Sequence, residues 1–242
     1  MNKSIFRAGS RLVLLVIFLK SLTASAQMLD GGVNSAMIRL FGDTTAFTAQ
    51  AEVRVLNSNH VVWLQMPSAF ASTDTKLRVD ADIKLIKSSV VTPAVILMMK
   101  QTGKDRITSV IRPDLRATFI IYPGSQSYIS MPLSAEDAQI ASQKLEKKRL
   151  GKETIDGHAC VKNLSTVKSS RGATLLQATT WNATDLKDFP LQVEMKENGS
   201  TTVIHFQNVN LVRPDAKLFD LPAGYKDENP PVATKAPAAK KK

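Results

Sequence analysis

Alternating apolar and polar residues predict most of the structural elements of this chain. Residues 45–56 end in an alternation of apolar side chains with Glu52 and Arg54, which indicates a strand with one buried face. A turn at residues 57–59 and a second apolar run at residues 60–66 complete a predicted hairpin. Similar patterns predict strands over residues 76–82, 106–111, 117–122, 127–131, 150–155, 159–168, 173–181, 191–197 and 201–210. The short turns between these segments, Asn198 and Gly199 among them, favour an antiparallel sheet.

Two further segments have the features of helices. Residues 134–149 begin with Ser134 as N-cap, have acidic residues in the first turn and end in basic residues, an order that suits the helix dipole. Residues 92–101 have Thr92 as N-cap and Pro93 at the first helical position. The middle of this second segment is apolar on every side, so we expect it to be buried or to cover an apolar surface.

The start of the chain has the pattern of a secretory signal. A cationic beginning is followed by an apolar run at residues 12–19 and by the small residues 24–26 of a cleavage site. The apolar run is much shorter than the roughly 20 residues of a membrane-spanning helix. We therefore expect export, to the periplasm of a Gram-negative bacterium or otherwise by secretion; an uncleaved N-terminal anchor is the alternative.

The expected domain organisation follows from these segments. It comprises a signal peptide at residues 1–26, a segment leading into the fold at 27–44, one β domain at 45–226 and a disordered tail rich in Pro, Ala and Lys at 227–242.

Charge changes this picture only at the C-terminus. The 242 residues carry 32 Lys+Arg against 21 Asp+Glu, and Lys235 and residues 240–242 concentrate part of the excess in the tail. Such a tail can be attracted to an anionic envelope surface, or can serve only to keep the protein soluble. The rest of the chain lacks the basic stripe with interleaved aromatic residues of a nucleic-acid binder, so we expect no nucleic-acid partner.

The residues that carry catalytic chemistry are sparse. His60, His158 and His205 have no metal-ligand spacing, and Cys160 is the single cysteine. No nucleophile elbow, phosphate-binding glycine loop or dinucleotide motif occurs. We therefore expect no enzyme, no catalytic residue, no metal and no cofactor. An unrecognised envelope hydrolase stays open as an alternative, because many active sites have no local signature.

The C-terminal half resembles a known family. LGKETIDGHAC at residues 150–160 is followed by Trp181 and by a terminal segment, residues 214–225, that matches the pattern P-x-x-x-F-x-x-P-x-G-Y with one extra residue between Pro214 and Phe219. KLRVD, DRITSVIRPD and YPGSQSYISMP in the first half resemble the same family, which is the LolA/LolB-like superfamily of outer-membrane lipoprotein carriers and their relatives. The resemblance covers about residues 45–226 and is closest to the periplasmic branch with that terminal signature.

This resemblance implies a mainly β fold with some α-helix: a curved antiparallel sheet, or incomplete β-barrel, with helices over its concave face. It also implies binding of an apolar ligand in that hollow, either a lipid acyl chain or a lipidated protein. No position matches a carrier's functional arginine. Relatives of this fold also act as envelope-stress sensors, so a protein-interaction module is the main alternative, and the oligomeric state stays open.

The helix at residues 92–101 can act as a lid over the hollow or pack permanently on the sheet. Methionine side chains are flexible and suit surfaces that meet varied apolar partners. We expect the ligand to contact strand faces and this helix. The candidate cavity residues are Val53, Val55, Trp63, Leu77, Val79, Leu97, Met98, Met99, Phe119 and Ile121.

Overall fold

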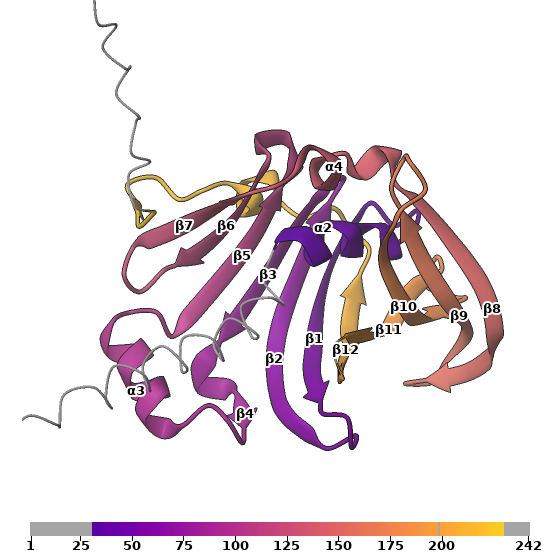
Figure 1. The fold of residues 1–242 in the computed structure, drawn as a ribbon, viewed down its shortest axis with the longest axis horizontal. Coiled ribbons are helices and arrows are strands. Elements are labelled where there is room, and N and C mark those ends of the chain that lie inside the picture. The colour runs from indigo at the N-terminus through magenta and orange to yellow at the C-terminus, as the bar shows by residue number, and fades with distance from the viewer. Residues whose placement is uncertain (1–30, 198, 230–242) are drawn as a thin grey trace, which may run out of the picture.

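The protein folds around one large, strongly curved β-sheet (Figure 1). The computed structural model describes residues 31–197 and 199–229. The sheet has 13 strands in the order β13-β7-β6-β5-β3-β2-β1-β12-β11-β10-β9-β8, with β4 paired to β2 beside this path. Neighbouring strands are antiparallel, except that β13 runs parallel to β7. Because β13 and β8 form two separate edges, the barrel is incomplete, and the predicted fold class is confirmed.

The element bounds agree with the alternation in the sequence. The strands are β1 (Ala46–Leu56), β2 (Val62–Thr73), β3 (Lys76–Asp82), β4 (Lys87–Ser88), β5 (Arg106–Arg112), β6 (Ala117–Tyr122), β7 (Ser127–Pro132), β8 (Lys144–Ile155), β9 (His158–Lys168), β10 (Thr174–Ala183), β11 (Phe189–Glu197), β12 (Ser200–Asn210) and β13 (Lys226–Asp227). The helices are α2 (Gly31–Leu40), α3 (Pro93–Gln101), α4 (Ala135–Ala138) and the 3₁₀ turns η1 (Ile83–Leu85), η2 (Pro113–Leu115), η3 (Ile140–Ser142) and η4 (Ala216–Phe219). All the predicted strands are present, and α3 begins as expected, with the Thr92 hydroxyl accepting the Val95 N–H.

The predicted helix at residues 134–149 is wrong beyond its first turn. Ser134 does cap α4, by accepting the Asp137 N–H, but the chain extends again at Lys144 to form β8. β8 pairs with β9 along its whole length, so interstrand hydrogen bonds replace the expected helical ones. β8 is also an edge strand, and its many Lys and Glu side chains protect such an edge from pairing with another chain. In the sequence, the same charges resembled the solvated face of a helix.

Helix α2, which the sequence pattern did not predict, covers part of the concave face (Figure 1). Residues 27–44 were expected only to lead into the fold. Instead, residues 35–38, Leu40 and Phe41 are buried against the sheet. The Phe41 ring lies 4.6 Å from Phe47, 5.6 Å from Phe189 and 5.8 Å from Phe206, measured between ring centroids. This aromatic cluster, completed by Phe70, joins α2 to β1, β2, β11 and β12.

Residues 211–229 form the C-terminal strap, which leaves the main core at Leu211, crosses the convex face and ends beside β7 at the sheet edge. Phe219 of the strap is buried in a second core with Val110 and Ile121. The Arg112 guanidinium donates to the Phe219 carbonyl at 2.9 Å and pairs with the Asp220 carboxylate at 3.1 Å. The strap therefore closes the convex side of β3, β5 and β6.

The end of the strap corrects the predicted start of the disordered tail. Lys226 and Asp227 form β13 beside β7, and the Asn229 side chain donates to the Ser130 carbonyl. The sequence predicted disorder from residue 227. The remainder of that tail, residues 230–242, and the predicted signal at 1–26 lie outside the described residues.

Candidate functional site

The strand register decides which predicted cavity residues share a face. Directly paired residues of antiparallel strands point to the same side of the sheet. Phe70, which contacts α2's aromatic cluster, pairs with Val79 on one side and with Ala49 on the other. The concave face therefore includes four of the predicted residues, which are Val53, Val55, Leu77 and Val79.

Phe119 and Ile121 lie on the opposite face. Phe119 pairs with Val110, Ile121 pairs with Thr108, and both belong to the core beneath the C-terminal strap. The Phe119 ring also contacts the Tyr128 ring, with centroids 6.0 Å apart. These two side chains cannot share a cavity with Val53, because the sheet itself separates them.

The concave face is filled where α2 crosses it. Leu77 is fully buried in the same core as α2, and so is Ile111 beside it. At 0% and 2% exposure, these two side chains present no surface for a ligand to contact. Leu77 therefore supports the floor of the site and does not line it.

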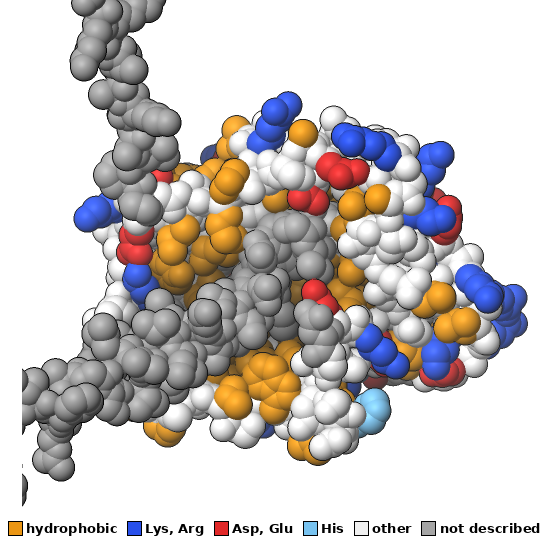
Figure 2. Space-filling model, viewed as in Figure 1, with side chains coloured by type: hydrophobic (Ala, Val, Ile, Leu, Met, Phe, Trp, Pro, Cys, Tyr) orange, Lys and Arg blue, Asp and Glu red, His pale blue; other side chains and the backbone are white. Residues whose placement is uncertain are grey.

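Beyond α2, the concave face continues as a surface of partly exposed apolar side chains. We call this surface the apolar strip. It crosses β2, β3, β5 and β7, and its six members are Met66, Val79, Ala81, Ile107, Ile129 and Met131. Figure 2, which shows this side of the molecule, has hydrophobic side chains at the surface over β5, β6 and β7. Alternation could have suggested these residues, but it does not show which face of each strand α2 leaves open.

The α3 residues lie at one end of the sheet rather than over its centre. α3 packs against η1, and Met99 is half-buried, whereas Leu97 and Met98 are 55% and 53% exposed. Trp63 is half-buried at the bulge where β2 leaves its register with β1, and its carbonyl accepts the Ser89 N–H. These four predicted residues therefore flank one end of the concave face.

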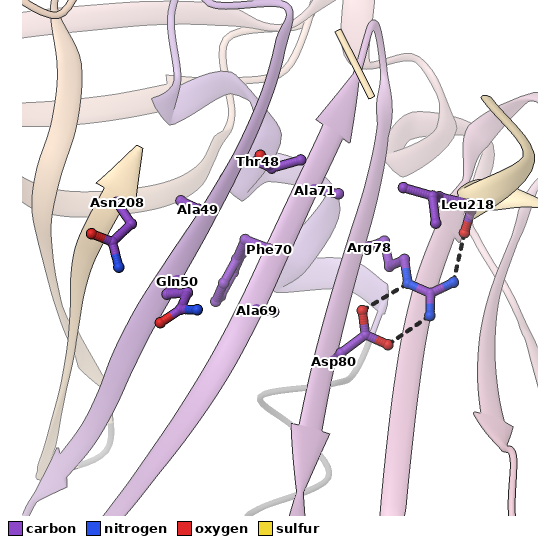
Figure 3. Close-up of a pocket in the computed structure, with 10 residues that line it drawn as sticks. All are labelled: Thr48, Ala49, Gln50, Ala69, Phe70, Ala71, Arg78, Asp80, Asn208 and Leu218. Atoms are coloured by element: carbon purple, nitrogen blue, oxygen red, sulfur yellow. Dashed lines mark hydrogen bonds and ion pairs between the residues drawn. The ribbon is translucent and has the colours of Figure 1, made fainter. Parts of the chain in front are cut away.

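A depression of about 380 Å³ lies on the convex face, beside the strap (Figure 3). Arg78 dominates one wall, where its Nε and Nη2 donate to the Asp80 carboxylate and its Nη1 donates to the Leu218 carbonyl. Arg78 thus neutralises Asp80. Because these Arg78 donors already form hydrogen bonds within the protein, we do not assign a ligand to this depression.

Two histidine–aspartate pairs lie near a second depression, of about 460 Å³. His158 Nδ1 is 2.7 Å from an Asp185 carboxylate oxygen, and His205 Nε2 is 2.7 Å from Asp156. The hydrogen bond from His158 lowers the pKa of Asp185, which weakens that carboxylate as a base. Burial raises the pKa of the nearby Cys160 thiol, which favours its unreactive protonated form.

These pairs provide a poor basis for nucleophilic catalysis. Among the described residues, neither imidazole hydrogen-bonds to a hydroxyl or thiol group that it could activate. The same part of the chain contains no group of three or more His, Cys, Asp or Glu residues arranged to hold a metal ion. It also contains no helix that is long and apolar enough to cross a membrane.

Comparisons with known proteins relate this geometry to solved structures. The chain is similar to a LolA superfamily protein from Nitrosomonas europaea, with 12% identity and a TM-score of 0.40 over 81% of this chain and 97% of that one. It is also similar to the Mycobacterium tuberculosis lipoprotein LppX (11% identity, TM-score 0.37, 73% of this chain and 94% of that one). A third similar structure is MucB in complex with MucA (14% identity, TM-score 0.38, 81% of this chain and 60% of that one).

No protein-family model and no curated protein matches the sequence. A likeness at these identities and TM-scores carries no conclusion about the family or the ligand of this protein. The function is therefore inferred from the chain's own surfaces.

Proposed function

We propose that this protein is exported to the envelope and binds an apolar ligand, a lipid acyl chain or a lipidated protein, without catalysing a reaction. The observation that carries this proposal is the apolar strip. A soluble domain gains stability by covering apolar side chains, yet α2 covers only part of the concave face. The uncovered part is available to a ligand of the same chemistry.

The apolar strip can provide the energy of binding without a polar anchor. Transfer of each methylene group from water contributes about 0.8 kcal/mol, so a chain of about a dozen methylenes supplies roughly 10 kcal/mol before the costs of association. Met66 and Met131 add flexible side chains that adapt to chains of different length. The expected specificity is therefore for chain length and saturation rather than for a head group.

We propose ligand contacts for those candidate cavity residues that lie on or beside the concave face. We assign Val79 to the strip itself and Val53 and Val55 to its border with the core. Leu97, Met98 and Met99 of α3, with Trp63, flank the end at which a chain can enter. Localisation in the periplasm, and attraction of the Lys-rich tail to an anionic envelope surface, belong to the same proposal.

A matched pair of substitutions on neighbouring strands tests the proposal. Ala81 of β3 points to the concave face, whereas Ala69 of β2, which pairs with Asp80, points to the convex face. Ala81→Lys places an ammonium group in the apolar strip, where an acyl chain cannot solvate it. Ala69→Lys adds the same group to the exposed opposite face.

The measurement is displacement of a fluorescent long-chain fatty acid from the protein, combined with native mass spectrometry of the protein purified from cells. We expect A81K to weaken probe binding at least tenfold, which corresponds to a loss of about 1.4 kcal/mol of binding free energy. A69K should leave probe binding within about twofold of the unsubstituted protein. The proposal fails if the unsubstituted protein takes up no probe and carries no lipid. It fails equally if the two lysine variants have the same effect.

A further inference from the structure

Six exposed apolar side chains gather at the α3 end of the sheet, and we call them the apolar rim. They are Val61, Val62, Leu85, Val90, Leu97 and Met98, and each is between 43% and 58% exposed. They come from the β1–β2 hairpin, η1, the segment after β4, and α3. Figure 2 shows hydrophobic side chains at the surface in this region, near β4 and the adjoining end of β2.

The contacts between these elements bring the rim together. β4 pairs with β2 at Leu64 and Ser88, and the Ser89 N–H donates to the Trp63 carbonyl. Val90 follows this pairing directly, and its N–H donates to the Ser88 hydroxyl at 3.1 Å. η1 packs against α3, and the Ile83 N–H donates to the Asp105 carbonyl just after α3. The rim is therefore a fixed feature of the fold, made from separate segments between residues 61 and 98.

α3 differs from an ordinary surface helix. None of its residues is buried, although its sequence is PAVILMMKQ. A surface helix normally turns its apolar side chains toward the core and its polar side chains toward water. In α3, Val95, Ile96 and Met99 are half-buried and Leu97 and Met98 still project outward. More than half of each of these two side chains is therefore left in contact with water.

Positive charge surrounds the rim. Residues 57–66 and 83–106 carry five cationic side chains, which are Lys84, Lys87, Lys100, Lys104 and Arg106, and a single carboxylate, Asp105. Lys84 is neutralised by Asp105 at 3.2 Å and by Asp82 at 3.5 Å, and Lys104 pairs with Glu228. Lys87, Lys100 and Arg106 are exposed and make no ion pair among the described residues. The surplus charge of the rim is therefore positive.

We propose that the apolar rim docks on the surface of an anionic phospholipid bilayer. Apolar side chains that project beside lysine and arginine are suited to this interface, because the apolar groups enter the acyl boundary while the cations remain at the phosphates. This inference rests on the proposed function and extends it. The rim flanks one end of the apolar strip, so docking brings that end of the strip against the hydrocarbon from which an acyl chain would come.

Two pairs of matched variants of the full chain test the docking surface. L97Q/M98Q removes the outward apolar pair of α3, and its control, L115Q/L150Q, removes equally exposed leucines from η2 and β8. K87Q/K100Q removes two unpaired rim lysines, and its control, K144Q/K152Q, removes two exposed lysines from β8. The N- and C-terminal residues are the same in all of these proteins, so differences between them report on the rim.

The assay is co-flotation with vesicles of phosphatidylethanolamine and phosphatidylglycerol, repeated with vesicles of phosphatidylcholine alone. We expect L97Q/M98Q to lower the partition constant on anionic vesicles at least tenfold. K87Q/K100Q should lower it about 25-fold, since one lysine near an anionic surface contributes about fivefold. The β8 controls should stay within about twofold of the unsubstituted protein, and added salt should weaken anionic binding.

Equal loss of vesicle binding in the rim variants and their controls would overturn the inference, as would equal binding to anionic and neutral vesicles by the unsubstituted protein. A crosslink to an envelope protein that requires Leu97 and Met98, with unchanged vesicle binding, would also overturn it and would identify a protein partner instead. Failure of the unsubstituted protein to bind anionic vesicles, with intact displacement of the fluorescent fatty acid, refutes only the docking surface. Failure of that displacement refutes the proposed function itself.

Discussion

Phe41→Ala tests whether α2 is a permanent part of the core or a removable cover. Phe41 directly follows α2 and is 1% exposed. Its ring contacts Phe47 of β1, Phe189 of β11 and Phe206 of β12 at centroid distances between 4.6 and 5.8 Å. Replacement by alanine removes one ring from this cluster and leaves a cavity beneath the end of the helix.

The expected cost follows from these contacts. Deletion of a buried phenylalanine side chain destabilises a protein by about 3–5 kcal/mol, and aromatic pairs contribute about 0.5–1.5 kcal/mol each beyond their buried area. We therefore expect F41A to lower the free energy of unfolding by about 4 kcal/mol. With a urea m-value of about 2 kcal/mol/M, the unfolding midpoint falls by about 2 M.

Urea denaturation followed by tryptophan fluorescence and by circular dichroism measures this change. Leu115→Ala is the control, because Leu115 is 55% exposed on η2 and its truncation should change the free energy by less than about 0.5 kcal/mol. A loss below about 1 kcal/mol in F41A, with an unchanged m-value, would refute the reasoning. It would show that α2 separates readily from the sheet, and a ligand site beneath the helix would then replace the one that we propose beside it.

Two further predictions concern buried polar groups and acid stability. The Thr118 hydroxyl is buried with no hydrogen-bond partner among the described residues, whereas the Thr180 hydroxyl bonds to Ser165 and Asn182. Urea titrations should therefore show T118V to be stabilising by about 1 kcal/mol and T180V to be destabilising by about 1–3 kcal/mol; the same sign for both would contradict the assigned network. Arg112 holds the pKa of Asp114 below its usual value, so the stability from this pair is present above about pH 4 and is lost as the pH falls through the lowered pKa. R112Q should consequently be less stable than the unsubstituted protein at pH 7, with a difference that narrows below pH 4, and a difference independent of pH would disprove the coupling.

The sequence determined the strands and α3, because their periodicity and caps are local. A period of two in residues 76–82 matches β3 residue for residue, and Thr92 caps α3 as its chemistry requires. The same local reasoning failed for β8. Its lysines and glutamates suit an exposed helix and an exposed edge strand equally well, and only the pairing with β9 distinguishes the two.

Only the tertiary structure decided which surfaces are open. Val79 and Ile121 look alike in the alternation, yet register places the first on the concave face and the second beneath the C-terminal strap. Leu77 and Ala81 share the concave face of β3, but α2 covers Leu77 and leaves Ala81 partly exposed. Periodicity reports that one face of a strand is apolar, but what covers that face comes from residues such as Phe41 and Phe219, which are distant in sequence. For this reason the apolar strip and the apolar rim emerge only when the chain is folded.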